Sequence, residues 1–367
     1  MDIKKSGARF SAIVGIGEKI KSLSEENGKE YLYLNRGINA VCNIDLSEVA
    51  AEIDYNSNEI QIYPANNGIK SFRDAINKEY FNNKTSSENI FITHGGMGAL
   101  DLVFCTIDVD KVYIPSFYWG AYVNIMKVRD IDHDIYESLE YIEANINKFK
   151  NSAVIICDPN NPLGNKYDDK LLMGLIKKLN DVGAVVLIDC PYRRIFYDAS
   201  DTFHQDLLEY KNVIILESFS KSVGLSGQRL AFVHCQNNDF FDEFRIRVLY
   251  NTNGVNAFAQ VLVRDLLTTD AGKKSASNFK KKTAEDIRKN IQYLKDNNLL
   301  ADEFYKNSIP VGIFVIVNKT EKELLDNYIG SVGLDFFTRN KEYGKIFSRI
   351  CVSVPHEKFV KFFSKML

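Results

Sequence analysis

Short runs of apolar residues recur through the middle of the chain, and each run ends in polar or glycine-rich residues. Runs of this length are typical of strands that are buried on both faces of a sheet. Segments of helical periodicity, such as Lys170–Asn180, lie between most of them. This alternation predicts an α/β fold in which helices flank a mostly parallel sheet. The runs that predict strands are Asn89–Thr93, Lys111–Ile114, Ala153–Cys157, Ala184–Ile188, Val213–Leu216 and Leu230–His234.

The pattern changes after about residue 239, and a smaller α+β domain is expected there. We expect residues 51–255 to form the large domain and residues 256–367 the small C-terminal domain, to which the N-terminal segment 1–50 also contributes. The segments that predict this part of the fold are helices at Asp239–Tyr250, Asn256–Thr268, Thr283–Asn297 and near Glu321–Tyr328, and strands at Val311–Val317 and Phe347–Val354.

Composition excludes several classes of protein. The 367 residues include 46 Lys and Arg and 48 Asp and Glu, and this balance lacks the basic surplus of a nucleic-acid or membrane-surface protein. We see no apolar run near the roughly 18 residues that span a bilayer, and no signal peptide. Six scattered cysteines form no Cys-x-x-Cys pair, and nothing suggests a metal. We therefore expect a cytoplasmic protein that binds neither nucleic acid nor membrane.

Candidate chemistry begins in the stretch from Ser218 to Arg229, which follows the predicted strand at Val213–Leu216. Lys221 lies there between small hydroxyl residues. Ser218 and Ser220 can bind a phosphate together with Arg229, whose guanidinium offers a planar fork of donors. A lysine beside a phosphate site suits a cofactor that carries both an aldehyde and a phosphate. The alternative is a surface loop with an incidental lysine.

Polar groups also follow three other predicted strands. A buried carboxylate such as Asp189 needs a cationic partner, and a protonated pyridine nitrogen is one. Tyr192 and Asn161 could donate hydrogen bonds to a phenolate oxygen on the same ring. The glycine-rich stretch 93–98 precedes a helix expected near Ala99, where backbone amides bind anions. The alternatives are a helix cap for Asp189 and a plain turn around Asn161. We expect all of these groups at one edge of the sheet, where α/β proteins bind ligands.

Together these stretches resemble the fold type I pyridoxal-phosphate enzymes, specifically the class I/II aminotransferases, over roughly Tyr63 to Arg349. The resemblance implies a large domain with a mostly parallel sheet, a smaller α+β domain, and pyridoxal 5'-phosphate as the cofactor. By this resemblance Lys221 is the Schiff-base lysine and the general base, and Asp189 pairs with the pyridinium. Tyr192 and Asn161 bond the ring oxygen. The phosphate site comprises Gly96, Met97, Ser218, Ser220 and Arg229.

The resemblance implies further roles around the ring and the substrate. Phe117 stacks on the ring, with Tyr118 as the competing candidate. Arg349 holds the substrate α-carboxylate, with Asn161 and Gly37 nearby. Tyr63 reaches the phosphate of the neighbouring subunit, which implies a homodimer with shared active sites.

Arg247 resembles an arginine of aspartate aminotransferases that binds the substrate's side-chain carboxylate across the dimer; the alternative is an exposed helix arginine. The chain departs from those enzymes at Met97, where they have a hydroxyl residue, and at Leu230-Ala231, where they have a small apolar residue and glycine.

The expected activity is transfer of an amino group between an L-amino acid and a 2-keto acid by a ping-pong mechanism, with an acidic substrate as one option. The same residues also suit a lyase, a decarboxylase or another biosynthetic enzyme that acts on an amino acid, because fold alone does not select the reaction. A transcription regulator with a cofactor-binding domain would need a basic DNA-binding surface, and the balanced charge argues against it.

Overall fold

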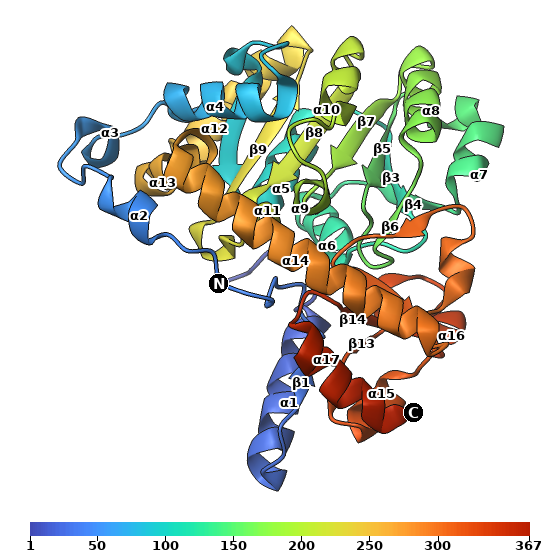
Figure 1. Cartoon of the computed structure of the whole chain (residues 1–367). Coiled ribbons are helices and arrows are strands. Elements are labelled where there is room, and N and C mark those ends of the chain that lie inside the picture. Colours follow the sequence, from blue (N-terminus) through green and yellow to red (C-terminus); the bar gives the residue numbers. More distant parts are fainter.

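The computed structural model of the chain has a broad central sheet with helices on both faces. A smaller unit lies below the ends of the strands (Figure 1). The structure describes the whole chain apart from the side chain at position 12. Within the described residues, seven strands form the large sheet in the order β2-β9-β8-β7-β5-β3-β4. Their bounds are β2 Ile90–His94, β3 Lys111–Pro115, β4 His133–Tyr136, β5 Ser152–Cys157, β7 Val185–Asp189, β8 Val213–Ser218 and β9 Leu230–Cys235.

One strand of this sheet, β9, runs against all the others. It pairs antiparallel with both β2 and β8, whereas β8, β7, β5, β3 and β4 pair in parallel. The predicted mostly parallel sheet is therefore confirmed. Because β9 is reversed, its first residues lie at the edge where its neighbours end: Leu230 pairs with His94, and Ala231 pairs with Ser218. Residues just before β9 thus meet residues just after β2 and β8.

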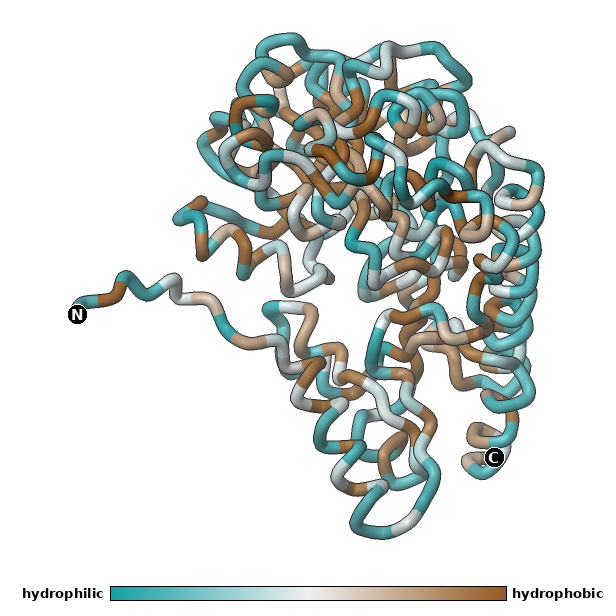
Figure 2. The backbone as a smooth tube through the Cα atoms, turned by 90° about the vertical axis from the view of Figure 1, so that its left-hand side faces the viewer, coloured by the Kyte–Doolittle hydropathy of each residue, from teal (hydrophilic) through white to brown (hydrophobic). Residues whose placement is uncertain are grey.

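The central strands are apolar because both of their faces are covered. In β5, Val154 and Ile156 belong to one hydrophobic core, and Ala153 and Ile155 belong to the core on the opposite face. Helices that contribute to the first core are α4 Lys70–Phe81, α8 Asp169–Asp181 and α13 Ala257–Thr268; those of the second are α5 Gly95–Thr106, α6 Gly120–Arg129 and α12 Asn238–Thr252. Figure 2 shows apolar segments of the chain in the interior and polar ones along the outer helices.

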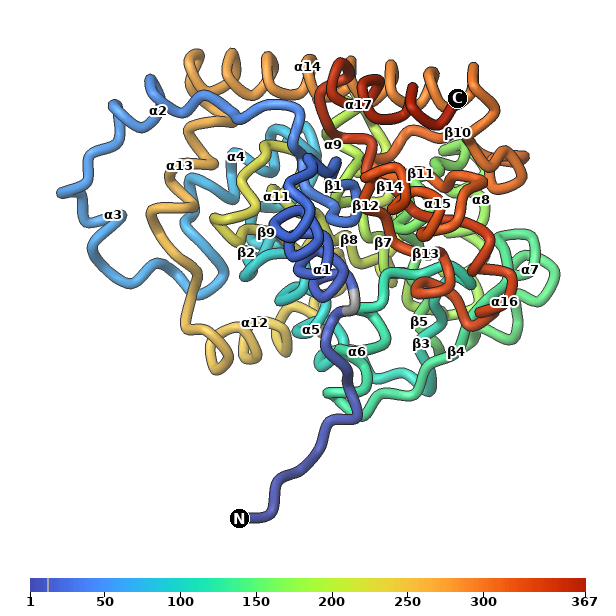
Figure 3. Tube along the Cα trace, turned by 90° about the horizontal axis from the view of Figure 1, so that it is seen from below, coloured from blue at the N-terminus to red at the C-terminus, as the bar shows by residue number. Residues whose placement is uncertain are grey.

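The smaller unit combines the two ends of the chain. Strands β11 Phe314–Val317, β14 Ser348–Cys351 and β13 Val332–Gly333 form an antiparallel sheet in that order. Strand β1 Leu32–Tyr33 pairs in parallel with β12 Ile329–Gly330, which joins the N-terminal segment to the C-terminal one. Seen from below, helix α1 Ala12–Asn27 lies beside these strands (Figure 3).

Helix α14, Asp270–Asp296, runs along one side of both units and contacts α13 near its start and α17, His356–Phe363, near its end. It begins 13 residues before the predicted start at Thr283, because its first half is lysine-rich and presents few apolar positions beyond Ala276 and Phe279. The remaining elements are α2 Ser47–Ala51, α3 Asn58–Gln61, α7 Leu139–Ala144, α9 Arg193–Phe196, α10 Phe203–Asp206, α11 Phe219–Ser222, α15 Glu321–Asp326, α16 Lys341–Gly344, β6 Asn165–Lys166 and β10 Ile309–Pro310.

Among the described residues, none of the helices combines the length and the apolar character that crossing a membrane requires.

Two titratable side chains are buried together, Glu217 of β8 and His204 of α10. Glu217 and His204 are almost fully inaccessible, and 3.5 Å separates His204 Nε2 from Glu217 Oε2. Burial raises the pKa of Glu217 to about 8 and lowers the pKa of His204 well below its ordinary value. Both groups are therefore uncharged near neutral pH, and Glu217 keeps its proton in the folded protein.

The buried proton of Glu217 predicts a pH-dependent loss of stability. The unfolded chain releases this proton near pH 4.5, whereas the folded protein releases it near pH 8. Relative to Glu217→Gln, the wild type should lose about 1.4 kcal/mol of unfolding free energy per pH unit across this interval. Urea unfolding at pH 5, 6, 7 and 8 measures the difference. The exposed Glu209→Gln is the control and should track the wild type; parallel curves for Glu217→Gln would contradict the prediction.

Candidate active site

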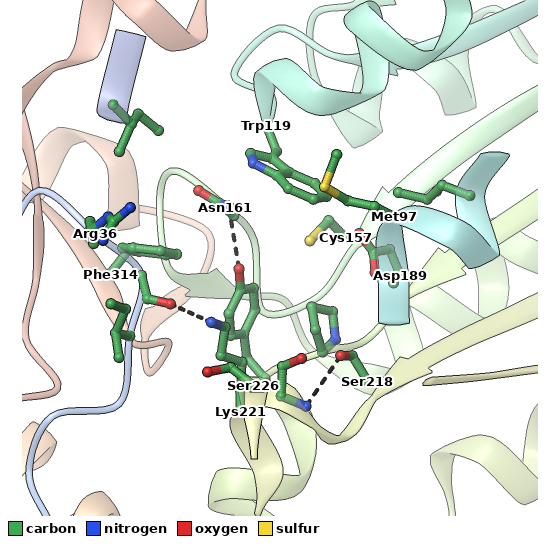
Figure 4. Close-up of a pocket in the computed structure, with 18 of the residues that line it drawn as sticks. Arg36, Met97, Trp119, Cys157, Asn161, Asp189, Ser218, Lys221, Ser226 and Phe314 are labelled. Carbon is green, nitrogen blue, oxygen red and sulfur yellow. Dashed lines mark hydrogen bonds between the residues drawn. The ribbon is translucent and has the colours of Figure 1, made fainter. Parts of the chain in front are cut away.

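A cavity of about 500 Å³ lies where the strands of the large sheet end and the smaller unit begins. This volume is within the range of small-molecule sites. Its walls come from the ends of β7 and β8, the start of α5, the segment 36–38, and strands β11 and β14. Figure 4 shows the lining side chains, with Met97, Trp119 and Asp189 at one end and Arg36 and Phe314 at the other.

Asp189, the last residue of β7, contributes a buried carboxylate to this cavity. Burial raises its pKa to about 6, and a hydrogen bond donated by the Tyr122 hydroxyl opposes that rise. Within the described part of the chain, Asp189 forms no ion pair, although a buried carboxylate normally has one. Tyr122 is itself fully buried, and its pKa lies well above the ordinary value, so it remains a donor.

A chain of hydrogen bonds joins the large sheet to the smaller unit. Asn161 Nδ2 lies 3.3 Å from the Tyr192 hydroxyl, and Asn161 Oδ1 accepts from Arg349 Nη1 at 3.0 Å. Arg349 Nη2 donates to the backbone carbonyl of Asn35 at 2.6 Å. The chain aims the tyrosine, the amide and the guanidinium at the same volume.

Arg349 is held between two aromatic rings. Its guanidinium carbon lies 4.2 Å from the centre of the Phe314 ring and 4.4 Å from that of Phe337. Burial lowers its pKa to about 10, so it remains charged at neutral pH. Among the described residues its Nε has no hydrogen-bond partner, and no carboxylate pairs with it. A rigid, desolvated cation of this kind favours binding of an anion.

Lys221 follows β8 on the short helix α11, and its amine donates to the backbone carbonyl of Gly37. Burial lowers the pKa of this amine, and the charges of Arg229 and Arg349 lower it further. A larger fraction is therefore unprotonated and nucleophilic than for an exposed lysine. A Cβ at Gly37 would lie 2.3 Å from Phe314 Cζ, so a larger residue there would displace the ring that packs on Arg349.

The start of α5 and the start of β9 form an anion cradle. Gly95, the first residue of α5, has φ of +69°, and a Cβ there would lie 2.7 Å from Arg229 Nη2. Glycine therefore lets the guanidinium approach the free amides of the helix start. Ser218 and Ser220 line the same end of the cavity. The exposed Arg229 donates to the carbonyl of Ser226 at 3.0 Å and, within the described structure, has no acidic partner.

The structure brings most of the expected site residues into this one cavity and leaves three outside it. Phe117 points away: it bridges to Thr338 and packs edge-on against Phe304 at 5.4 Å between ring centres. Trp119 lines the cavity instead, and its ring meets Tyr122 edge-on. The residues inside are Gly37, Gly96, Met97, Asn161, Asp189, Tyr192, Ser218, Ser220, Lys221, Arg229 and Arg349.

Tyr63 and Arg247 are the other two residues outside the cavity of their own chain. Tyr63 is 84% exposed. Arg247 lies on α12, where its Nε is 2.7 Å from Glu243 Oε1. Neither residue contributes to the site within a single chain.

Several lining or supporting residues were missed from the sequence. Trp119 follows Phe117 and Tyr118, so the sequence shows an aromatic run here. Which of the three rings faces the cavity depends on the conformation of the turn, and the sequence pattern does not specify that. Tyr122 and Phe337 reach the site from a helix and from a distant loop, and Asn35 contributes only its carbonyl. These contacts depend on long-range packing, which a local pattern does not contain.

The arrangement fits pyridoxal 5'-phosphate. The unpaired carboxylate of Asp189 suits a protonated ring nitrogen, Tyr192 and Asn161 suit the ring oxygen, and Lys221 suits the aldehyde. The cradle beside Arg229 suits the phosphate.

Comparison with known proteins gives the same result. The family model "Aminotransferase class I and II" matches residues 32–358. The histidinol-phosphate aminotransferase of Flavobacterium psychrophilum is 25% identical over 309 residues, which cover 77% of this chain and 86% of that protein. The aspartate aminotransferase of Pyrococcus horikoshii is 26% identical over 254 residues, 64% of this chain and 63% of that protein.

Solved structures share the fold. The aspartate aminotransferase of Thermus thermophilus with maleate superposes with a TM-score of 0.81 at 16% identity, and both chains are covered completely. An aminotransferase from Mycobacterium tuberculosis gives 0.84 at 16% identity and covers 100% of this chain and 98% of that one.

The hydrogen bond from Tyr122 to Asp189 predicts a cofactor-binding defect in Tyr122→Phe. Without that donor the pKa of Asp189 should rise further above its ordinary value, and the carboxylate should hold a ring cation less well. We expect the Kd for pyridoxal 5'-phosphate to rise about tenfold, as for loss of one hydrogen bond to a charged group. Titration of the cofactor-free protein measures it. Tyr118→Phe, which removes a hydroxyl outside the cavity, is the control; equal affinities for both variants would contradict the prediction.

Proposed function

The chain belongs to the class I and II aminotransferases, whose cofactor is pyridoxal 5'-phosphate, and we propose that it moves an amino group between an L-amino acid and a 2-keto acid by a ping-pong mechanism. One observation carries this proposal. The buried, unpaired carboxylate of Asp189 lies in the same cavity as the amine of Lys221 and the unpaired guanidinium of Arg349. These three groups match a ring cation, an aldehyde and a carboxylate.

When bound, the cofactor supplies an aldehyde that bonds to amines and a ring that accepts the electron pair left by a departing Cα proton. In our proposal Asp189 keeps the ring nitrogen protonated by the opposite-charge effect. Tyr122 fixes the orientation of that carboxylate. Tyr192 and Asn161 would donate hydrogen bonds to the ring oxygen.

Lys221 has two tasks in this proposal. Its amine would hold the aldehyde of the cofactor, and with substrate present it would act as the general base that takes the proton from the substrate Cα. The lowered pKa of this amine favours both tasks. Its contact with the carbonyl of Gly37 shows that the amine reaches into the cavity beside the segment that carries Arg36.

Arg349 orients the substrate. The guanidinium would bind the α-carboxylate in place of its present contacts, while Phe314 and Phe337 exclude water from its two faces. The attraction between charges is stronger where water is excluded. The substrate Cα is thereby held near Lys221. The amino group would remain with the cofactor when the first substrate leaves as a keto acid, and a second keto acid would take it up in the same cavity.

We further propose a homodimer in which Tyr63 reaches the phosphate site of the partner subunit. Large exposed apolar side chains gather on α12 and the neighbouring turn: Tyr250 is 84% exposed, and Ile246 and Ile62 are also exposed. A hydrogen bond of 2.8 Å from Asn66 Nδ2 to Asn253 Oδ1 ties the turn to the end of α12. Several large exposed apolar side chains on neighbouring elements favour an interface. Arg247 lies on the same helix and would reach a partner site by the same route.

The cell compartment is a further part of the proposal. All six cysteines are free in the structure, and four of them are buried. Unpaired thiols of this kind are typical of a reducing compartment and favour a cytoplasmic enzyme.

Transamination predicts a reversible spectral change. Protein loaded with pyridoxal 5'-phosphate is titrated with L-amino acids, and the visible absorbance of the bound cofactor should fall with a good donor and return when a 2-keto acid is added. Lys221→Ala should slow this change by a factor of about 100 to 10,000, the usual contribution of a general base. The exposed Lys211→Ala is the control. Persistent absorbance with release of pyruvate, ammonia or carbon dioxide would instead identify a lyase or decarboxylase.

The exposed apolar surface predicts a dimer in solution. Light scattering should give twice the 41.9 kDa of a single chain. Tyr250→Asp places a charge in the proposed interface and should yield monomers with weaker cofactor binding, since Tyr63 no longer meets a partner site. Leu171→Asp, on α8 away from α12 in Figure 1, should remain dimeric. A monomeric wild type would contradict the proposed dimer.

A further inference from the structure

Arg36 is a cavity-lining cation with no assigned partner. It is exposed, its side chain lines the cavity, and its guanidinium forms neither a hydrogen bond nor an ion pair with any described residue. Figure 4 shows it beside Phe314, across the cavity from Met97 and Asp189. It therefore lies at the end of the cavity opposite Asp189 and Met97, two of the residues proposed to bind the cofactor.

Contacts on both sides fix the position of Arg36. The carbonyl of Asn35 accepts from Arg349 Nη2 at 2.6 Å, and the carbonyl of Gly37 accepts from the Lys221 amine. The segment thus lines the cavity between Arg349 and Lys221, the groups proposed to bind the α-carboxylate and to take the Cα proton. Neighbouring Cα atoms are about 3.8 Å apart, so the side chain of Arg36 starts close to both of these backbone contacts, at Asn35 and at Gly37.

The charges that line the cavity leave one cation unassigned. The lining residues include four cations and one carboxylate: Arg36, Lys221, Arg229, Arg349 and Asp189. In the proposed function Asp189 faces the ring nitrogen, and Lys221 faces the aldehyde. Arg229 then faces the phosphate, and Arg349 faces the α-carboxylate. Only Arg36 has no counterpart, and a guanidinium in a cavity favours a carboxylate or phosphate that it can bind with two parallel hydrogen bonds.

We infer that Arg36 is a specificity-determining residue that binds an anionic group on the substrate side chain, so that the enzyme takes amino acids bearing a second carboxylate or a phosphate. The inference rests on the proposed function and assigns the side-chain contact to the same chain as Lys221. The acidic-substrate option therefore does not require Arg247 of a partner subunit.

Binding of unreactive acids to the cofactor-loaded protein tests this role without turnover. Succinate and 3-phosphonopropionate carry two anionic groups, whereas butyrate carries one. We expect calorimetry to show that at least one dianion binds about tenfold or more tightly than butyrate, as for one charge-assisted contact. The tighter dianion identifies the carboxylate or the phosphate as the preferred group.

Variants attribute the effect to Arg36. Arg36→Gln should abolish the advantage of the dianions and leave butyrate unchanged, and Arg36→Lys should restore part of it. Arg288→Gln, an exposed arginine of α14 outside this cavity, should behave as wild type.

Three results would overturn the inference: equal wild-type affinity for all three acids, an equal loss for all three in Arg36→Gln, or an advantage that survives in Arg36→Gln. Failure of the proposed function is a separate result, in which no amino acid alters the cofactor spectrum while succinate binding still depends on Arg36.

Discussion

Asp189 is a buried carboxylate without a cation, and the site is organised around that charge. It is the last residue of a central strand, paired in register with Cys157 on one side and with Leu216 on the other. Because both faces of the sheet are covered, the carboxylate is largely buried and borders only the cavity. Burial raises its pKa to about 6, and the one hydrogen bond from Tyr122 offsets this only in part. A ring cation would remove the remaining cost, and the same attraction would keep the ring protonated.

The reversed strand β9 explains how groups far apart in sequence meet around one ligand. In a purely parallel sheet, the residue before a strand lies at the edge opposite to the ligand. Here Arg229 precedes β9 and therefore lies beside the ends of β2 and β8. Gly95 gives its guanidinium access to the start of α5. The positive charge of Arg229 thus reaches this end of the cavity because β9 is reversed and because Gly95 has no Cβ.

The sequence predicted the parts of this structure that depend on local pattern. Six apolar runs match six strands to within one or two residues. Residues at or just after the ends of β2, β5, β7 and β8 line the cavity, and at β9 the residue before the strand does so. Strand β4 was missed because its residues, His-Asp-Ile-Tyr, are mostly only partly buried and do not form a continuous apolar run. Phe117 was placed in the site instead of Trp119, because the choice depends on pairing with Thr338, more than 200 residues away. Contacts that need a second chain, such as those proposed for Tyr63, are beyond what a single chain can display.

The two arginines near Asn35 differ in burial: Arg349 is buried, and Arg36 is exposed. Arg349 is held by two rings and by hydrogen bonds, so in the proposed function it would be pre-organised for the α-carboxylate that every amino acid and 2-keto acid shares. Arg36 is exposed and has no partner among the described residues, so the contact with an anion inferred for it would be weaker and reversible at little cost. A ping-pong enzyme must accept two different side chains in one cavity. In the proposed function the held cation would bind the common group. The exposed side chain of Arg36, whose backbone alone is fixed by its neighbours, would bind the variable group and could return to water when the second substrate is neutral.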